Sequence, residues 1–183
     1  ALLPGERDGN LFRELDRDIG ELDQLIDEIL LASRLDAGQH GLRKDEQVDL
    51  AGLCAEECAR VSAQFDIATA PGWPLPMVNG DARLLRRMIR NLLENAVRYG
   101  DGKPVEVLLN AAPAATTLSV CDRGPGVRED ERERIFEPFY RADGASERHG
   151  GVGLGLALAR SIAVRHGAQL RCEPRGGGGS CFV

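Results

Sequence analysis

The sequence predicts an α+β protein, a two-layer α/β sandwich whose mixed sheet carries helices on one face, preceded by one long helix. Apolar residues recur at helical spacing near the start of the chain, and two largely β-branched or apolar runs adjoin near its middle. Helical and strand patterns interleave without the strict βαβ rhythm of a doubly wound parallel sheet. We therefore divide the chain into residues 1–42, a helix with its linker, and residues 43–183, a mixed α/β domain.

Residues 10–37 are predicted to form the long helix. Its apolar seam, with steps of three and four residues as in a coiled coil, consists of Phe12, Leu15, Ile19, Leu22, Ile26 and Ile29. Leu11, Leu25 and Leu30 widen the seam, as packing in a four-helix bundle requires. A solvated helix folded back on its own domain is the alternative, which a stripe of this length disfavours. Polar residues with two glycines over 38–46 indicate a linker.

Capping residues and apolar runs predict the elements of the second part. Asp49 can cap a helix whose apolar face includes Cys54 and Cys58, which we interpret as small buried hydrophobes rather than metal ligands. The turn at residues 79–81 caps a second helix that ends near Tyr99. The further expected elements are antiparallel strands at 105–110 and 116–121, a helix at 154–166, and a final strand pair at 169–172 and 180–183.

Charge and cysteine content exclude several functional classes. The net charge of -6 argues against nucleic acid as the main partner, because binding a phosphate backbone requires a basic surface. No apolar run approaches the roughly 18–20 residues that cross a bilayer. Five cysteines without a CxxC pair predict neither a zinc site nor a disulfide framework, which is typical of a reduced, intracellular chain. Because the chain starts at Ala1 without a Met, we interpret it as a piece of something longer.

Two asparagines stand in the second half of a helical row whose first half is apolar. Asn91, Asn95 and Arg98 continue the row of Leu84 and Met88. Buried amides are costly unless they are hydrogen-bonded, and a carboxamide oxygen is a hard ligand suited to Mg²⁺ together with substrate phosphates. Arg98 is within reach of such phosphates. The alternative is an amphipathic helix whose polar border contains asparagine.

Two glycine-rich stretches complete the motifs. Residues 122–126, Asp-Arg-Gly-Pro-Gly, directly follow a predicted strand. An aspartate there can accept hydrogen bonds from an exocyclic amine, and glycine lets a ligand approach the backbone, although a surface turn is the alternative. Residues 150–155 open a helix and offer backbone N–H groups to a phosphate. Neither a dinucleotide fingerprint nor a Walker A motif fits this spacing.

Together these motifs resemble the catalytic, ATP-binding part of bacterial sensor histidine kinases. Their GHKL superfamily also contains type II topoisomerases, a heat-shock chaperone ATPase and mismatch-repair ATPases. Residues 91–99 resemble the N box of the family, 122–126 its G1 box, 135–141 its F box and 151–155 its G2 box. The long helix resembles the second helix of the dimerisation and phosphotransfer hairpin. The resemblance implies a Bergerat-type ATP-binding fold with ATP and Mg²⁺ as cofactors.

The resemblance also implies a role for each matching residue. Asn95 would be the Mg²⁺ ligand, Asn91 would support the phosphate end, and Asp122 would read the adenine amino group. The other implied ATP-binding residues are Arg98 and Arg141 at the phosphates, Tyr99 near the adenine or sugar, Gly124 and Gly126 beside the base, and Gly151, Val152, Gly153, Leu154 and Gly155 in the G2 box. Residues 140–153 would form a mobile lid, with Phe136 and Phe139 as its anchors.

The histidines of the chain lack the context of the family's phosphoacceptor, which stands beside an acidic residue a few positions before Thr/Asn-Pro. His40 and His166 are expected to be exposed, and His149 falls in the lid. The resemblance therefore implies a kinase that donates the γ-phosphate to a histidine outside this sequence, for relay to a response-regulator aspartate. The parent protein is expected to be a homodimer in the inner membrane, with this portion in the cytoplasm.

Two other functions are compatible with the motifs. One is a degenerate nucleotide-binding or dimerisation module without kinase activity. The other is an ATPase of the same superfamily, in which a glutamate four residues before the Mg-binding asparagine activates water. Asn91 occupies that position here, and an amide cannot act as a base, so fast hydrolysis is disfavoured.

Overall fold

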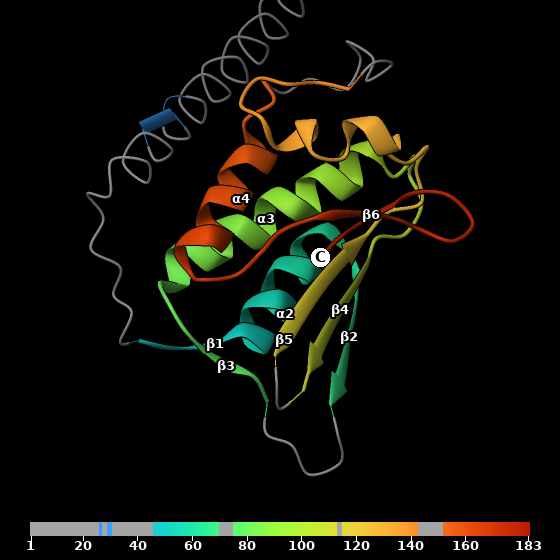
Figure 1. Ribbon diagram of the computed structural model, residues 1–183. Coiled ribbons are helices and arrows are strands. Elements are labelled where there is room, and N and C mark those ends of the chain that lie inside the picture. Colours follow the sequence, from blue (N-terminus) through green and yellow to red (C-terminus); the bar gives the residue numbers. More distant parts are fainter. Residues whose placement is uncertain (1–25, 27–28, 31–45, 70–74, 113–114, 143–151) are drawn as a thin grey trace, which may run out of the picture.

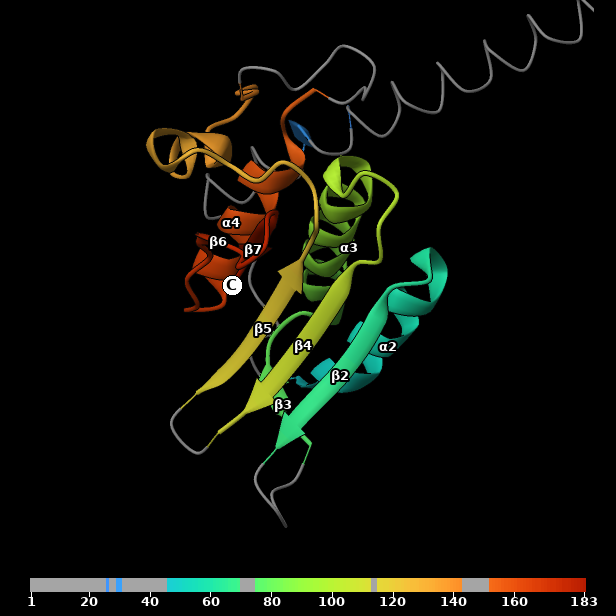
Figure 2. The same ribbon diagram turned by 90° about the vertical axis from the view of Figure 1, so that its right-hand side faces the viewer.

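The computed structural model has two layers, a five-stranded sheet and the helices α2, α3 and α4 on one of its faces (Figure 1). It describes residues 26, 29–30, 46–69, 75–112, 115–142 and 152–183. In Figure 2 the strands β2, β4 and β5 face the viewer, and α2 and α3 lie behind them. The predicted α+β sandwich is therefore confirmed. Of the predicted long helix only Ile26, Ile29 and Leu30 are described, as helical and exposed, and the rest of it lies outside the described residues.

The sheet is mixed because one of its neighbouring pairs is parallel. Its order is β2 (Gln64–Thr69), β4 (Glu106–Ala111), β5 (Thr116–Cys121), β7 (Ser180–Phe182) and β6 (Cys172–Pro174). β2 runs parallel to β4, and every other neighbouring pair is antiparallel. The predicted strands at 105–110, 116–121 and 180–183 are confirmed, whereas the strand expected at 169–172 begins only at Cys172.

Three strands were not predicted from the sequence. β1 (Gln47–Asp49) and β3 (Met77–Asn79) pair as a separate antiparallel ribbon. β2 is an edge strand, and its side chains are mostly exposed, so its apolar pattern is weak. Its register, Phe65 opposite Val107, is set by the distant strand β4 rather than by its own sequence.

The helices begin where the capping residues predicted. Asp49 precedes α2 (Leu50–Val61) and accepts a hydrogen bond from the Gly52 N–H at 2.9 Å. Asp81 precedes α3 (Ala82–Tyr99) and accepts hydrogen bonds from the backbone N–H groups of Arg83 and Leu84. These contacts satisfy N–H groups that have no partner inside the helix. α4 (Gly155–Arg165) follows two 3₁₀ turns, η1 (Glu129–Glu131) and η2 (Arg134–Phe136). No helix among the described residues is long and apolar enough to span a membrane.

The core fills the space between the sheet and the helices. Ile89 and Leu92 of α3, Leu109 of β4 and Phe182 of β7 are at most 2% exposed. Phe136 of η2 packs against the Phe182 ring edge to face, with ring centroids 6.3 Å apart. This packing fixes α3 and the end of β5 relative to each other, and those two elements carry most of the candidate site.

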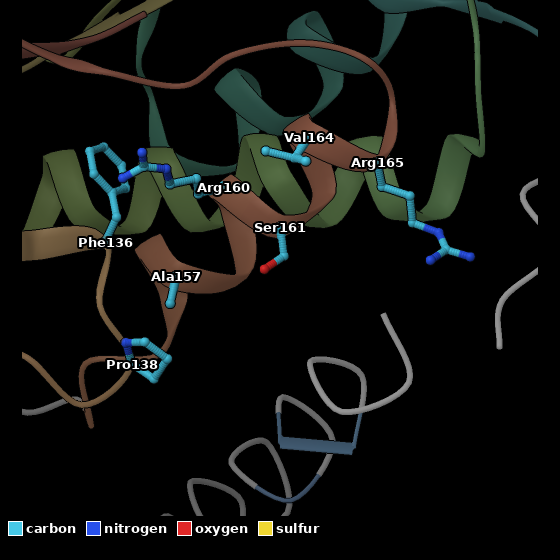
Figure 3. Close-up of a pocket in the computed structure, with 7 residues that line it drawn as sticks. All are labelled: Phe136, Pro138, Ala157, Arg160, Ser161, Val164 and Arg165. Carbon is cyan, nitrogen blue, oxygen red and sulfur yellow. The ribbon is translucent and has the colours of Figure 1, made fainter. Parts of the chain in front are cut away.

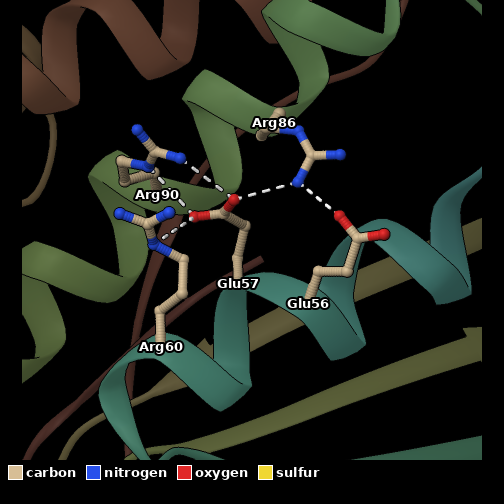
Figure 4. A network of polar contacts seen from close by, with 5 residues as sticks. All are labelled: Glu56, Glu57, Arg60, Arg86 and Arg90. Carbon is tan, nitrogen blue, oxygen red and sulfur yellow. Dashed lines mark hydrogen bonds and ion pairs between the residues drawn. The ribbon is translucent and has the colours of Figure 1, made fainter.

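A buried carboxylate ties α2 to α3 (Figure 4). Glu57 is 2% exposed and accepts hydrogen bonds from Arg90 Nε and Nη2 and from Arg86 Nη1, at 3.0–3.1 Å. Arg60 adds an ion pair from the same helix. The hydrogen bonds from Arg90 and Arg86 hold the pKa of Glu57 below its ordinary value, although burial opposes this effect. Glu57 is therefore a paired charge, as a buried carboxylate must be.

The expectation about cysteine pairing was wrong. Cys121 of β5 and Cys181 of β7 form a disulfide, while Cys54, Cys58 and Cys172 are free and buried. The two bonded residues are 60 positions apart in the sequence and come together only because β5 and β7 are neighbours in the sheet. Sequence spacing holds no information about such a pairing. The interpretation of Cys54 and Cys58 as small core residues is confirmed.

Candidate functional site

The two asparagines of α3 differ in their contacts, and Asn91 is the one that touches the start of α4. Asn91 is 4% exposed, and its Nδ2 donates a hydrogen bond to the Gly155 carbonyl oxygen at 3.0 Å. Its Oδ1 accepts no hydrogen bond from a described residue. Asn95, one turn further on, is half-buried, and its side chain makes no hydrogen bond within the described residues. Arg98 is exposed in the last turn of the helix. Among the described residues, two amide oxygens and one cation of this row therefore have no hydrogen-bond or ion-pair partner.

Asp122 is a buried carboxylate at the end of β5. It is 3% exposed, and its Oδ1 accepts hydrogen bonds from the backbone N–H of Gly124 at 2.8 Å and of Ser180 at 3.4 Å. Its own backbone N–H donates to the Ser180 carbonyl oxygen at 2.9 Å. Its Oδ2 accepts no hydrogen bond from the described part of the chain. One oxygen is thus held in place and the other is available to a donor outside the protein.

The loop at residues 122–126, here called the Asp122 loop, contains two glycines that lie close to backbone atoms of other segments. A Cβ added at Gly124 would lie 1.9 Å from the carbonyl oxygen of Tyr99, the last residue of α3. Gly126 has a φ of 81°, and its Cβ would lie 3.0 Å from the Gly179 carbonyl oxygen. Gly124 therefore lets this loop pack directly on the end of α3. The loop and the asparagine row, which are about 30 residues apart in sequence, meet at Tyr99.

The second glycine-rich stretch leads into α4. Gly151 lies outside the described residues, and Val152 is 40% exposed. Gly153 has a φ of 78°, and a Cβ there would lie 2.8 Å from the Tyr140 carbonyl oxygen. Leu154 is buried and gives the helix no side-chain cap, so the first backbone N–H groups of α4 remain open to an anion beside Asn91.

The lid prediction is only partly testable, because residues 143–151, which include His149, lie outside the described residues. Phe136 is buried and Phe139 is exposed, and their role as anchors of the lid stays a prediction. Phe139 is 61% exposed and has a φ of 66°, because its backbone turns there to donate a hydrogen bond to the Gly153 carbonyl oxygen. Arg141 is exposed and takes part in an interaction of its own, so its predicted role at the γ-phosphate stays a prediction.

His166 is half-buried rather than exposed, which corrects the sequence-based expectation. Its Nε2 accepts a hydrogen bond from the Asp81 backbone N–H at 3.1 Å, and its Nδ1 lies 2.8 Å from the Ile162 carbonyl oxygen. The ring therefore joins the end of α4 to the start of α3. Its contacts place it in the scaffold rather than in phosphotransfer chemistry. His40 lies outside the described residues.

Comparison with known families identifies the domain that carries these features. The model of the family described as histidine kinase-, DNA gyrase B- and HSP90-like ATPase matches residues 80–183. The match begins just before α3 and includes the asparagine row, the Asp122 loop and the start of α4. The chain belongs to this ATPase family. The resemblance drawn from the motifs is thereby confirmed.

Curated relatives of this ATPase domain are sensor kinases. The sensor protein RstB of Escherichia coli (strain K12) is 40% identical over 174 residues, which are 92% of this chain and 39% of RstB. The signal transduction histidine-protein kinase/phosphatase MprB of Mycobacterium sp. (strain KMS) is 35% identical over 185 residues, covering 97% of this chain and 34% of MprB. The chain therefore spans less than half the length of these relatives.

Solved structures of histidine kinases share the fold. The mycobacterial sensor histidine kinase MprB has a TM-score of 0.63 and 28% identity, with 75% of this chain and 93% of that chain covered. Full-length ShkA, crystallised in complex with AMPPNP, has a TM-score of 0.77 and 26% identity, covering 100% of this chain and 38% of that one. The five-stranded mixed sheet with its helices is thus the architecture of these ATP-binding domains.

Several residues that support the Asp122 loop were not predicted from the sequence. Gly179, Ser180 and Arg175 come from the β6–β7 hairpin, and the Arg175 Nη1 donates a hydrogen bond to the Asp122 carbonyl oxygen at 3.1 Å. Arg175 also pairs with Glu106 of β4, which Arg123 reaches from the other side. The hydrogen bonds from Arg175 and Arg123 lower the pKa of Glu106 to about 2. The only sequence signal for this hairpin was its run of glycines.

A separate hollow of about 450 Å³ lies on the outer side of α4 (Figure 3). Its lining includes Phe136, Pro138, Ser161 and Val164, and the Arg160 guanidinium carbon stands 5.0 Å from the centre of the Phe136 ring. None of the candidate nucleotide-binding residues lines it.

Proposed function

We propose that this chain binds Mg-ATP and presents its γ-phosphate to a histidine on another segment, as the catalytic part of a sensor histidine kinase. The phosphoryl group would then pass to a response-regulator aspartate. The observation that carries the proposal is the buried Asp122 carboxylate, with one oxygen held by two backbone N–H groups and the other open. This residue stands within the matched ATPase domain and beside the end of the asparagine row.

The Asp122 carboxylate suits adenine in particular. The exocyclic amine of adenine is a hydrogen-bond donor, so the open Oδ2 can accept from it. Guanine carries a carbonyl oxygen at the same position, which would face a carboxylate without a proton between them. Because Asp122 is only 3% exposed, the mismatch would not be relieved by water, and the site is expected to discriminate between the two bases.

The asparagine row and the start of α4 suit the phosphates. The Asn95 amide oxygen is uncommitted and of the hard type that Mg²⁺ binds, and the Mg²⁺ shell is commonly completed by phosphate oxygens and water. No group of three or more acidic, histidine or cysteine side chains that could hold a metal exists among the described residues. A metal bound here would thus depend on the nucleotide. Mg²⁺ would supply neutralisation of phosphate charge, while Arg98 and the open N–H groups of α4 bind phosphate oxygens.

Phosphotransfer would depend on positioning and charge rather than on a base in this domain. Asn91 is committed to Gly155 through its Nδ2 and offers no group that can remove a proton from water. This favours transfer to a positioned histidine over hydrolysis. RstB is named a sensor protein and MprB a signal transduction histidine-protein kinase/phosphatase. We infer that the parent chain dimerises through its long helix, with this portion in the cytoplasm.

A calorimetric titration of the 183-residue chain with a non-hydrolysable ATP analogue tests the proposal. Binding should strengthen when Mg²⁺ is added. Asp122→Asn should lower the affinity for the ATP analogue by about tenfold or more and reduce its preference over the GTP analogue, because an amide can also donate to guanine. Asp66→Asn, the same change on the exposed face of β2, is the matched control. No binding at millimolar nucleotide, or unchanged affinity in Asp122→Asn, would contradict the assignment.

A further inference from the structure

A disulfide joins β5 and β7, the two strands whose ends adjoin the Asp122 loop. Cys121 is the last residue of β5, and Cys181 lies directly opposite it in β7, with Cα atoms 4.1 Å apart. The β5–β7 ladder contains only one other residue pair, Val120 with Phe182. A ladder of two residue pairs is a weak support in itself, so the covalent bond is a substantial part of what holds these strand ends together.

Both halves of the disulfide adjoin the candidate adenine site. Asp122 directly follows Cys121, and Ser180 directly precedes Cys181. The Asp122 backbone N–H donates a hydrogen bond to the Ser180 carbonyl oxygen, and the Ser180 N–H donates to Asp122 Oδ1. A Cβ at Gly179 would lie 2.2 Å from the Asp122 carbonyl oxygen, so the two chains are in close contact here. The disulfide therefore links the two strand ends that hold the Asp122 carboxylate in place.

The sulfur atoms lie on the open face of the sheet, away from the core. Side chains alternate along a strand, and Val120 and Phe182 are buried toward the helices, so Cys121 and Cys181 point the other way. Both are half-buried. In the same row, Glu106 of β4 stands opposite Cys121. A reductant can therefore reach this bond from the side that no helix covers.

The free cysteines are poor candidates for redox chemistry. Burial raises the pKa of Cys54 to about 12 and that of Cys58 to about 11, so both remain protonated thiols at neutral pH. Burial also raises the pKa of Cys172. Because the thiolate is the nucleophile in exchange reactions, these three side chains are disfavoured as participants. All five cysteines of the chain belong to the described residues.

We propose that Cys121 and Cys181 form a reversible thiol–disulfide site that sets the affinity of the adjacent pocket for nucleotide. Its reaction partner is a dithiol reductant, and the inference rests on the proposed nucleotide-binding role of Asp122. A thiolate of the reductant attacks one sulfur, the bond between Cys121 and Cys181 breaks, and a mixed disulfide forms. The second thiol of the reductant then displaces this intermediate. Two electrons and two protons pass to the cysteine pair, and the reductant leaves as a disulfide. A disulfide oxidant reverses the exchange.

The oxidised form is the tighter binder. With the bond intact, Asp122 and Ser180 keep their relative positions before nucleotide arrives. After reduction, only the two residue pairs of β5 and β7 and the hydrogen bonds of Asp122 hold these strand ends together. Part of the free energy of nucleotide binding is then needed to order the strand ends. We expect the affinity for nucleotide to fall by about three- to tenfold on reduction.

Titration calorimetry of the full 183-residue chain in its two redox states tests the inference. One sample is oxidised with excess oxidised glutathione and the other reduced with dithiothreitol. Alkylation and mass spectrometry verify that residues 121 and 181 are blocked in the first sample and labelled in the second. Both are titrated with the non-hydrolysable ATP analogue in the presence of Mg²⁺. Circular dichroism of both samples verifies that the reduced chain keeps its fold.

The double variant Cys121→Ser/Cys181→Ser is the matched control, because it retains the three buried cysteines. It should bind nucleotide as weakly as the reduced chain under both conditions. Equal affinities of the oxidised and reduced wild-type chain would overturn the inference, as would a redox response that persists in the double variant or a failure of residues 121 and 181 to oxidise. Absence of binding in both redox states would instead contradict the proposed function, and the redox coupling with it.

Discussion

Asn91 and Asn95 lie one helical turn apart on α3, yet their environments differ. Asn91 is buried and donates to the Gly155 carbonyl oxygen, so it fixes the start of α4 against α3. Asn95 is half-buried, and its side chain makes no hydrogen bond within the described residues. The first amide thus supports the scaffold and the second is free to bind a ligand. Gly124 is a second residue that decides a contact by itself. Because it has no side chain, the Asp122 loop can contact Tyr99.

Replacing Asn95 with Ala should abolish the dependence of nucleotide binding on Mg²⁺. The substitution removes the uncommitted amide oxygen without breaking a hydrogen bond within the described residues, so the fold should persist. Calorimetry with and without Mg²⁺ measures the effect. Asn110→Ala, on the exposed outer face of β4, should retain the metal dependence. A wild-type response to Mg²⁺ in Asn95→Ala would refute the metal assignment.

Replacing Gly124 with Ala should destabilise the domain by about 1–3 kcal/mol and weaken nucleotide binding, because the new Cβ would overlap the Tyr99 carbonyl oxygen at 1.9 Å. Thermal and urea denaturation measure the first effect, and nucleotide titration measures the second. The control is Gly176→Ala, whose Cβ would meet no atom within 4 Å. Equal unfolding free energies for the two variants would show that the close approach is absent in solution.

At the scale of elements, α3 carries the proposed phosphate-binding residues and is held from both sides. α4 contacts it through Asn91 and through His166, and α2 contacts it through Glu57. Arg86 and Arg90 lie one turn apart on α3, which lets the single carboxylate of Glu57 bind both. The network therefore fixes the rotation of α3 about its axis, and this rotation decides which way the asparagine row points.

Replacing Glu57 with Gln should lower the free energy of unfolding at pH 7 by about 1.5–3 kcal/mol, the range for hydrogen bonds to a charged group. Because the native pKa of Glu57 lies below its ordinary value of 4.5, its stabilising effect is present above that pH and is lost as the pH falls through the native pKa. The difference between wild type and variant should therefore shrink in acid. Urea denaturation at pH 7 and below pH 4.5 measures both effects.

Glu56→Gln is the matched control for this experiment. Glu56 precedes Glu57 and pairs with Arg86, but its side chain is 62% exposed, so its loss should change the unfolding free energy by less than about 1 kcal/mol. Figure 4 shows both carboxylates on the same arginine. An equal effect of the two substitutions would mean that burial of Glu57 adds nothing to the strength of its pairing.

At the scale of the whole molecule, the sheet brings the two ends of the site together. The Asp122 loop leaves the end of β5, the β6–β7 hairpin supports it, and the C-terminal end of α3 packs against it. Each part alone is a turn or a helix end of an ordinary kind. In the proposed nucleotide site, one core holds the base-recognising and phosphate-binding ends at a fixed separation.

The isolated chain should hydrolyse ATP slowly, with a turnover below about 1 s⁻¹. The position of a water-activating base is occupied by Asn91, which is committed to Gly155, and no acceptor histidine stands in the family's sequence context. Phosphate release at saturating Mg-ATP measures the rate, and Asp122→Asn provides the background. A faster turnover that this variant abolishes would favour the ATPase alternative.

The sequence by itself determined the elements whose signals are local. The caps at Asp49 and Asp81, the row of Asn91 and Asn95, and the glycine-rich stretches each depend on neighbours within one or two turns, and the structure confirms the helices and the central strand pair that they predicted. The family followed from the same local motifs, because their order along the chain is itself information.

The tertiary structure decided everything that depends on contacts between distant segments. The edge strand β2, the Cys121–Cys181 disulfide, the support of Asp122 by Ser180 and Arg175, and the burial of His166 against Asp81 join residues 42 to 85 positions apart. No local pattern encodes such a pairing, since strand order and helix packing are set by burial of the core as a whole. That Asp122 Oδ2 accepts no hydrogen bond from the described residues is therefore a property of the assembled sheet, although the aspartate itself is visible in the sequence.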